Sequence, residues 1–285
     1  ARAPRTPLLG SPPRLIAMSL LTFPRRSGAR ALALTVLLCA CSVNAGGPSA
    51  PPEEEPLNLL LITIDTLRRD HLGCYGYFRN TSPNLDALAA KGLRFSQFYN
   101  TAKCHSSRVS LLTGLYCDQA GSASLSRGAT IAEVLGKAGY STSMVGKWHL
   151  SQQPTDFGFQ RYWGHLSGAC NFFTGDESFR YNGEKYEVPK VLNGRPFYTT
   201  HAMGDFALKF LDEATAKDDP FLLYVAFNAP HYPLHAPEAD VKKCAGRYDG
   251  GWDQLRATRY AKQLKSGLIP KKFALSKRPA HIPAW

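Results

Sequence analysis

The sequence lacks several features that would assign the chain to a special class. Its seven cysteines include no CxxC pair, which argues against a zinc site. No internal repeat occurs. The N-terminal apolar run, Ala31–Ala40, is about half as long as a membrane-spanning helix needs to be. The length of 285 residues, of which 44% are hydrophobic and 20% charged, instead suits one large globular domain or two small ones.

Acidic residues are absent from residues 1–45, so the unbalanced basic residues of this segment account for half of the net charge of +12. The segment carries six arginines, whereas the rest of the chain holds 28 basic and 22 acidic residues. That modest surplus suits an anionic substrate. No dense basic stripe with interleaved aromatic residues is found, so we predict that the protein does not bind nucleic acid.

The N-terminus has the pattern of an export signal. Residues 1–17 are rich in Pro and Arg and are interpreted as upstream translation, with Met18 as the true start. Residues 18–45 combine positive charge, a short apolar run and small residues, as signal peptides do. Two processing patterns remain open: a lipoprotein box in which Cys41 is acylated, or ordinary cleavage near Ala45. Either pattern predicts a periplasmic or extracellular protein, with a lipid anchor in the first case.

Five cysteines lie beyond the signal segment, and their odd number leaves at least one unpaired in an oxidising compartment. An unpaired cysteine in an exported protein points to a chemical role. The five are Cys74, Cys104, Cys117, Cys170 and Cys244.

Patterns typical of strands and helices alternate along residues 57–285, after a Gly-, Pro- and Glu-rich linker at 46–56. The uninterrupted apolar run Leu57–Ile64 predicts a strand buried on both faces. The alternation predicts an α/β fold with a mixed, largely parallel sheet. Further strands are expected at Thr142–Val145 and Phe221–Phe227, and helices at Pro83–Gly92, from the capping box Thr130–Glu133 to Gly139, and near Gly204–Ala214.

Two segments show no regular period. Residues 150–200 are rich in aromatic residues and glycine, and we predict long loops that shape a pocket. The segment Tyr260–Trp285 is basic and Pro-rich, and we predict no helix or strand there. We interpret it as the end of an interrupted chain.

Two polar segments in the first half of the chain carry candidate chemistry. Asp65 follows the first strand, where a carboxylate is able to hold a hard cation, although a turn cap is the commoner role. Cys104 opens a short apolar helix that also contains Arg108. Helix amide groups and a guanidinium beside this side chain would stabilise an anion, although a structural cysteine is the commoner reading of such a position.

Three further segments lie in the second half. Lys147 and His149 directly follow a predicted strand, and their spacing on an extended segment predicts that they project to the same side. His231 follows the last strand, between prolines that fix the backbone around a proton-transfer group. Ser167 is predicted to contact substrate oxygens. Together these residues form a set suited to binding and cleaving an oxyanion ester at the carboxyl ends of the strands.

Several separate blocks of the sequence, in the right order, resemble the sulfatase family. The family signature has a Cys or Ser, then x-Pro-x-Arg, then an apolar stretch that ends in Thr-Gly, and the chain reads CHSSRVSLLTG from Cys104. The flanking blocks SPNLDALAAKGLRFSQFYNTAKC, TIAEVLGKAGYSTSMVGKWHL and FLLYVAFNAPHYPLHAP are also similar to those of the family. The resemblance covers roughly Leu57 to Trp285. It implies the alkaline-phosphatase-like fold, with a mixed, largely parallel sheet and helices on both faces.

The resemblance also implies a mechanism and a set of roles. A separate formylglycine-generating enzyme would oxidise Cys104 to formylglycine, whose hydrated form attacks the sulfur of a sulfate ester. The expected substrate is a sulfated small molecule or a sulfated polysaccharide. The resemblance assigns Asp65 and modified Cys104 to a calcium ion, with magnesium as the alternative, Arg108 and His149 to the hydrated aldehyde, Lys147 to the sulfate, and His231 to the sulfate or the leaving oxygen.

Three departures from the family pattern bear on these roles. Ser106 stands where the family usually has Pro, and Thr66 follows Asp65 where the family usually has a second carboxylate. No Asp-Asn metal pair or further Lys is found after the His231 region. We therefore interpret the chain as the N-terminal part of a longer enzyme and expect weak metal binding and little turnover from it.

Two competing functions remain open at this point. A phosphatase or phosphonate-ester hydrolase of the same superfamily would use Thr or Ser directly, so Cys104 followed by Arg108 favours sulfate. The second is a non-catalytic, truncated lipoprotein that binds anions or a partner.

Overall fold

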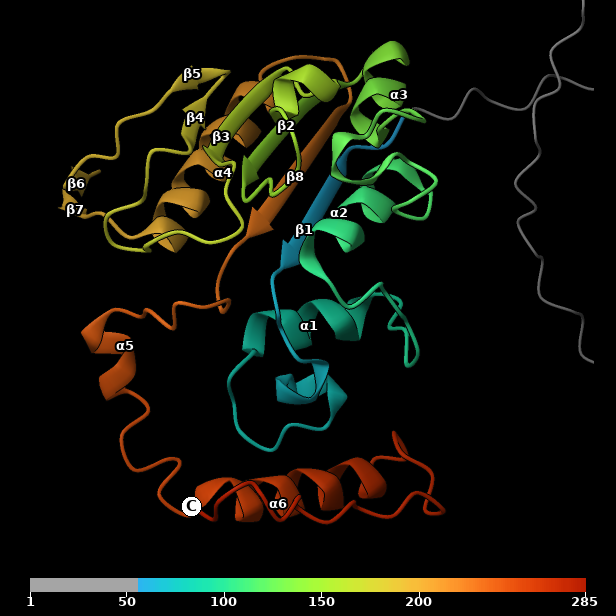
Figure 1. Cartoon of the computed structure of the whole chain (residues 1–285), viewed down its shortest axis with the longest axis vertical. Helices are drawn as coiled ribbons and strands as arrows, with labels where there is room; N and C mark the ends of the chain where they lie inside the picture. Colours follow the sequence, from blue (N-terminus) through green and yellow to red (C-terminus); the bar gives the residue numbers. More distant parts are fainter. Residues whose placement is uncertain (1–55) are drawn as a thin grey trace, which may run out of the picture. The chain divides into compact units, whose positions relative to one another are not determined.

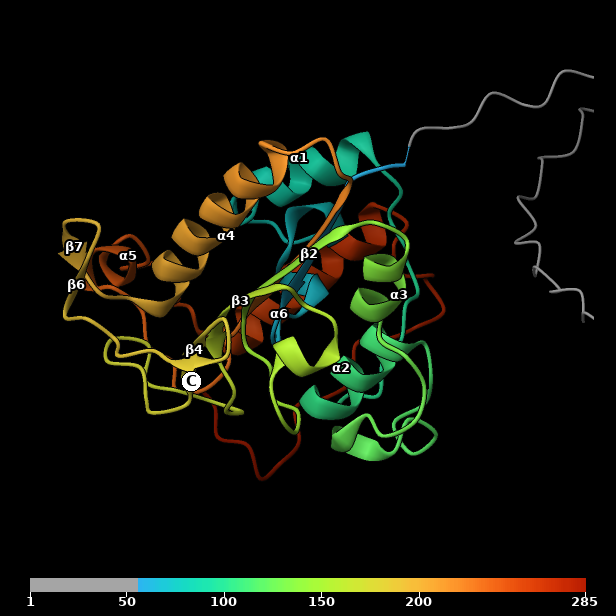
Figure 2. The same cartoon turned by 90° about the horizontal axis from the view of Figure 1, so that it is seen from above.

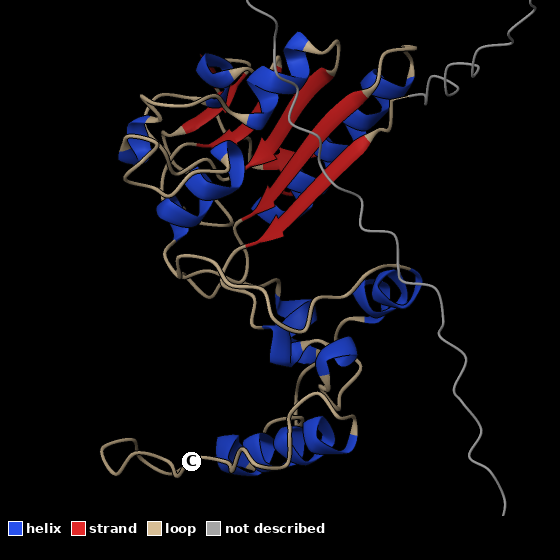
Figure 3. Cartoon of the chain, turned by 90° about the vertical axis from the view of Figure 1, so that its right-hand side faces the viewer, coloured by secondary structure: helices blue, strands red, loops and turns tan. Residues whose placement is uncertain are grey.

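The computed structural model describes residues 56–285. The predicted signal segment, the acylation site at Cys41 and all but the last residue of the linker lie outside them. The described part contains a six-stranded sheet in the order β1-β8-β2-β3-β4-β5 (Figures 1 and 3). Its strands are β1 (Leu59–Ile64), β2 (Ser141–Gly146), β3 (Arg161–His165), β4 (Phe179–Tyr181), β5 (Glu184–Lys185) and β8 (Phe221–Phe227).

The first four strands in this order run parallel, and β4 and β5 run antiparallel to their neighbours. Strand β8 lies between β1 and β2, pairing Phe227 with Ile64 and Val225 with Val145. The carboxyl ends of β1, β8 and β2 therefore meet at one edge of the sheet. The prediction of a mixed, largely parallel sheet is confirmed.

Helices cover both faces of this sheet (Figure 2). Helix α4 contacts β8 and β2 on one face, and α2 and α3 lie on the other. A separate hairpin pairs β6 (Val191–Leu192) with β7 (Arg195–Pro196). The helices are α1 (Pro83–Lys91), α2 (Cys104–Thr113), α3 (Ile131–Lys137), α4 (Thr199–Thr215), α5 (Glu238–Lys242) and α6 (Gly251–Lys265), with short 3-10 turns at η1 (Arg69–His71), η2 (Gly73–Tyr75), η3 (Ser122–Ser124) and η4 (Pro154–Phe157).

Strand β8 explains why the sheet has two hydrophobic cores. Its side chains alternate, so Leu222 and Tyr224 pack in the core beneath α2 and α3, whereas Leu223 and Val225 pack in the core beneath α4. All four side chains are buried. Because alternate side chains face opposite cores, a central parallel strand needs apolar residues at every position.

The predicted burial of Leu57–Ile64 on both faces is wrong. Strand β1 forms there, but it pairs only with β8 and lies at the edge of the sheet. Leu60 is 55% exposed and Ile62 is 47% exposed. An apolar run indicates a strand, but its burial depends on what covers it, and within residues 56–285 no strand pairs with the outer edge of β1.

The two segments without a period contain more structure than predicted. Residues 150–200 include β3, whose first three residues pair with β2 although its sequence RYWGH is short and mixed. Helix α6 runs through Tyr260 to Lys265, where we predict no helix. In both places tertiary contacts decide the local structure over a weak sequence pattern. Within residues 56–285, no helix combines the length and apolar character needed to cross a bilayer.

The predicted capping box at the start of α3 forms. The Thr130 hydroxyl accepts a hydrogen bond from Glu133 N (3.1 Å), and the Glu133 carboxylate accepts one from Thr130 N (2.7 Å). Thr130 is 1% exposed, and its hydroxyl also donates to Phe157 O (2.7 Å). This side chain therefore ties the helix to the turn at η4.

We expect Thr130→Ala to lower the free energy of unfolding by about 1–2 kcal/mol, because it removes a helix cap and leaves a buried carbonyl unpaired. Urea unfolding measured by circular dichroism tests this. Thr215→Ala is the control, since that hydroxyl is exposed and bonds only within its own helix, and a change below about 0.5 kcal/mol is expected. Equal losses in both variants would contradict the assigned role of Thr130.

Candidate active site

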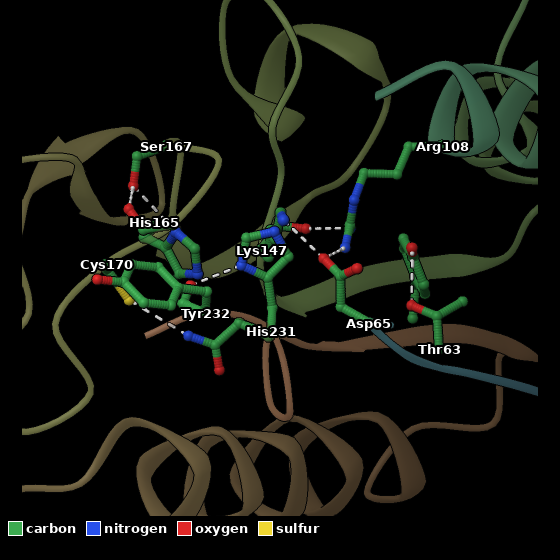
Figure 4. A network of polar contacts seen from close by, with 12 residues as sticks. Thr63, Asp65, Arg108, Lys147, His165, Ser167, Cys170, His231 and Tyr232 are labelled. Atoms are coloured by element: carbon green, nitrogen blue, oxygen red, sulfur yellow. Dashed lines mark hydrogen bonds and ion pairs between the residues drawn. The ribbon is translucent and has the colours of Figure 1, made fainter. Parts of the chain in front are cut away.

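Three charged side chains meet at the carboxyl ends of β1 and β2 (Figure 4). Lys147, the first residue after β2, places Nζ 2.6 Å from Asp65 Oδ2, and Asp65 is the first residue after β1. Arg108, on α2, places Nη2 3.4 Å from the same carboxylate oxygen. A second guanidinium nitrogen of Arg108 donates to Lys147 O at 2.6 Å. The structure thus brings together three of the predicted site residues.

This cluster is buried and carries more positive than negative charge. The exposed fractions of the side chains are 0% for Lys147, 9% for Asp65 and 8% for Arg108. Burial raises the pKa of Asp65, but the Lys147 hydrogen bond and the charges of Lys147, Arg108 and His231 outweigh it, so the pKa lies below its usual value. The carboxylate therefore stays ionised and leaves one surplus positive charge in a poorly solvated place.

The close approach of the strand ends depends on a glycine. Gly146, the last residue of β2, has φ of 108°, and a Cβ there would lie 2.2 Å from Ala226 O of β8. Only glycine adopts this conformation with so little space. It lets the chain leave β2 so that Lys147 reaches across the end of β8 towards β1.

Cys104 lies at the first position of α2, as predicted, and its thiol forms no disulfide with another cysteine of residues 56–285. The first amide groups of a helix lack partners within it and favour negative charge. A cavity of about 1150 Å³ is lined by Cys104, Asp65 and Arg108, among others. The candidate nucleophile therefore shares one cavity with Asp65 and Arg108, the two members of the charged cluster that line it.

His149 lies beside this cluster. Its φ is 57°, so the segment after β2 is not extended throughout. The extended backbone from which we predict that Lys147 and His149 project to the same side is therefore wrong. Burial lowers the pKa of His149 to about 4, and the charges of Lys147 and Arg108 act in the same direction. Its Nδ1 is buried and has no hydrogen-bond partner among the described residues. A neutral imidazole with a free nitrogen is thus available next to the cluster.

Gly168 makes room for that ring, because a Cβ at this position would lie 2.6 Å from His149 Nε2. His231, which follows β8, lies close enough to Asp65 for its charge to lower the pKa of that carboxyl (Figure 4). Its Nδ1 lies 2.6 Å from Tyr232 O, which holds the ring in one orientation.

Ser167 is not brought to the cluster by any contact. Its hydroxyl lies 3.0 Å from Asp176 Oδ2 and 2.9 Å from Ala169 O, and it accepts a hydrogen bond from Ser178 at 3.0 Å. These bonds stabilise the turn after β3. The predicted contact with substrate oxygens stays a prediction.

Sequence reasoning missed one feature of the main cavity. The hydroxyl groups of Thr63 and Tyr224 lie 3.1 Å apart and both residues line the cavity. Both residues lie in strands of mostly apolar sequence, and nothing in that sequence indicates that their hydroxyl groups line a cavity. They offer neutral hydrogen-bonding groups beside Asp65.

The described residues do not by themselves fit a calcium ion. They contain no group of three or more His, Cys, Asp or Glu side chains arranged to hold a metal. Calcium needs six to eight oxygen ligands, whereas Asp65 Oδ2 is already engaged by Lys147 and Arg108. In this structure, cations of the protein occupy the carboxylate that the resemblance assigns to the metal.

Acidification is expected to destabilise the fold through two histidines, His165, which is buried, and His149, which is partly buried. Burial lowers the pKa of His165 to about 3, and that of His149 to about 4, from an ordinary value of 6.5. Between these values the unfolded chain binds more protons, so stability is lost as the pH falls from about 7 to about 4. For the fully buried His165 the slope is at most about 1.4 kcal/mol per pH unit.

Urea unfolding at a series of pH values tests this prediction, and His165→Leu is expected to flatten the slope whatever its effect at neutral pH. His281→Gln, at an exposed position, is the control and is expected to leave the slope unchanged. A slope that is the same in all three proteins would contradict the role of His165.

Comparison with known proteins identifies the family. A family model described as Sulfatase matches residues 57–267. An arylsulfatase from Klebsiella aerogenes is 30% identical over 256 residues, which cover 79% of this chain and 53% of that protein. The chain spans about half the length of the relatives that it matches.

Two solved structures are similar as well. The crystal structure of Ps i-CgsB in complex with k-i-k-neocarrahexaose is 27% identical, with a TM-score of 0.58, and 74% of this chain and 53% of that one are covered. The structure of BT4656 in complex with its substrate D-glucosamine-2-N,6-O-disulfate is 29% identical, with a TM-score of 0.53 and coverages of 62% and 35%. With the matched model covering most of its length, the chain belongs to the sulfatase family.

Proposed function

We propose that the protein hydrolyses sulfate esters, with residue 104 as the nucleophile after its conversion to formylglycine. One observation carries the proposal: Cys104 lines the same cavity as Asp65 and Arg108, which with Lys147 form a buried cluster of surplus positive charge. A compact oxyanion is the ligand that such a cluster attracts.

The surroundings of residue 104 fit the modified side chain. The position is partly buried at a helix N-terminus, which favours a negatively charged oxygen. When present, formylglycine supplies a hydrated aldehyde whose oxygen attacks sulfur and whose second hydroxyl allows release of the sulfate. A separate formylglycine-generating enzyme, with its own oxidant, is the partner that this proposal requires. Its recognition of Ser106 in place of the usual Pro is part of the proposal.

The side chains of the chain itself supply charge and proton transfer. Lys147 uses one ammonium hydrogen on Asp65, so two remain for the oxygens of a sulfate group. His149 is neutral at pH 7, since its pKa is about 4, so it acts as a hydrogen-bonding group and not as an acid. His231, partly exposed beside the cluster, is assigned proton donation to the leaving oxygen.

The substrate class follows from the relatives and from the cavity. The two similar structures are complexes with k-i-k-neocarrahexaose and with D-glucosamine-2-N,6-O-disulfate. The cavity of about 1150 Å³ has room for more than a sulfate group. We therefore propose a sulfated sugar, either small or part of a polysaccharide, as substrate. Export to the periplasm or the cell exterior, with or without lipidation at Cys41, remains part of the proposal.

Co-expression of the full chain with a formylglycine-generating enzyme tests the function. We expect an aldehyde at position 104, detected by mass spectrometry of the peptide, and slow release of sulfate from para-nitrophenyl sulfate. Cys104→Ala is expected to lose both signals, whereas Cys117→Ala, at a partly buried cysteine outside the cluster, should keep both. An unmodified thiol in an active protein would overturn the nucleophile. Faster release of phosphate from para-nitrophenyl phosphate would favour the phosphatase reading.

Calcium stays a prediction, and the chain is expected to bind it weakly, with a dissociation constant of about 10⁻³ M or higher, because Asp65 is the only carboxylate in the cluster. Isothermal titration calorimetry measures this. Asp65→Asn should abolish the remaining binding, and Asp118→Asn, outside the cluster, should not. Tight binding that survives Asp65→Asn would show that the ion binds elsewhere.

A further inference from the structure

The positive charge of the described chain is concentrated at its C-terminal end. Residues 56–241 contain 17 basic and 17 acidic residues, whereas residues 242–285 contain 11 basic and two acidic ones. The whole surplus of nine charges therefore belongs to the segment that includes α6. A strongly basic segment that follows a part of zero net charge attracts anions.

A second cavity, of about 780 Å³, lies where α6 meets α1 and the turn at η2. Three basic residues line it, Arg79, Arg94 and Lys262, and the single acidic lining residue is Asp86. No residue lines both this cavity and the one that contains Cys104. It is a separate place on the molecule.

Asp86 does not neutralise these cations by direct contact. Its carboxylate accepts hydrogen bonds from Cys74 N at 2.7 Å and from the Ser82 hydroxyl at 3.1 Å. Those bonds secure the turn before α1. Among the ion pairs of residues 56–285, none includes Arg79, Arg94 or Lys262.

Arg79 is held by rings and not by a carboxylate. Its guanidinium carbon lies 5.0 Å from the centre of the Phe78 ring and 4.6 Å from that of Tyr248. Stacking of this kind fixes a guanidinium without consuming its hydrogen-bond donors. Nη1 of Arg79 is buried and has no hydrogen-bond partner in the described part of the chain. A buried hydrogen-bond donor without an acceptor destabilises the folded protein, unless a ligand supplies the acceptor.

Arg94 and Lys262 are fixed in similar ways. Arg94 donates to Cys74 O, and its guanidinium carbon lies 5.5 Å from the centre of the Tyr75 ring. Lys262 Nζ donates to Tyr77 O at 2.8 Å and keeps two further hydrogens. Each cation is therefore positioned by neutral groups, and only Lys262 lies near enough to Asp86 for its charge to lower the pKa of that carboxyl.

We propose that this cavity is a second anion site, which binds a sulfate group of a polysulfated glycan. The three cations present fixed donors to a tetrahedral oxyanion, and the basic segment around α6 attracts the rest of the polymer. The choice of a sulfated glycan over other polyanions rests on the proposed function, whereas the existence of the anion site does not.

Binding of an end-labelled, short-chain dextran sulfate to the full chain, followed by fluorescence anisotropy, tests the site. The triple variant Arg79→Gln, Arg94→Gln, Lys262→Gln is expected to bind at least about tenfold more weakly, because charge-assisted hydrogen bonds are lost. The single variant Lys262→Glu, on the exposed side of α6, is expected to act in the same direction if the triple variant does not fold.

The matched control is Lys137→Gln, Lys185→Gln, Lys217→Gln, which removes the same charge from exposed positions without ion pairs. It should change the affinity by less than about threefold. The six arginines of residues 1–45 are present in every variant, so they do not affect the comparison. Equal weakening in both triple variants, or no binding at all, would overturn the site.

Two further measurements test which kind of anion the site binds. Sodium sulfate should displace the glycan more effectively than sodium chloride at equal ionic strength, and equal displacement would contradict a built oxyanion site. Single-stranded DNA of equal charge should bind more weakly; if it binds as tightly through the same residues, the assignment to a glycan is wrong. Repeating the assay with Cys104→Ala keeps the result independent of catalysis, since the second site should bind unchanged even if hydrolysis is never observed.

Discussion

The contact of Lys147 with Asp65 is the interaction on which the candidate active site depends. Two cations and one carboxylate share a place where each side chain is less than a tenth exposed. Without Asp65, Lys147 and Arg108 would be buried and unpaired, which is strongly unfavourable. With it, the cluster keeps one surplus positive charge. The same carboxylate therefore makes the cluster stable enough to form and leaves it attractive to an anion.

The topology of the sheet makes this contact possible. Asp65 and Lys147 follow β1 and β2, which are not neighbours, because β8 lies between them. The contact therefore spans the carboxyl end of β8, where the chain turns away towards His231. It joins residues 82 positions apart in the sequence. The aspartate side chain is short, and the glycine at the end of β2 lets the chain turn there. The long lysine side chain therefore spans the distance between the ends of β2 and β1.

Where sequence alone predicted the structure, a local pattern was sufficient. The seven apolar residues of β8 and the capping box at Thr130 each define an element from neighbouring residues, and both formed as expected. The sequence also identified the residues that meet at the strand ends, because parallel strands place them there. It could not predict that Lys147 pairs with Asp65, nor that Ser167 bonds to Asp176, because such contacts depend on how separate segments pack. The same limit applies to the exposure of β1, which depends on its neighbours and not on its own composition.

The two cavities follow one physical rule. Elsewhere in the described chain, seven basic side chains pair with a carboxylate, as Arg195 does with Asp205 at 2.6 Å. At the Cys104 cavity two cations share one carboxylate, and around α6 three cations are held by carbonyl oxygens and aromatic rings. A fixed cation that lacks a full counter-charge attracts an anion at little cost in side-chain entropy. Because both places meet this condition in one chain, the proposed polysulfated glycan, with several charged groups, is consistent with the charge distribution.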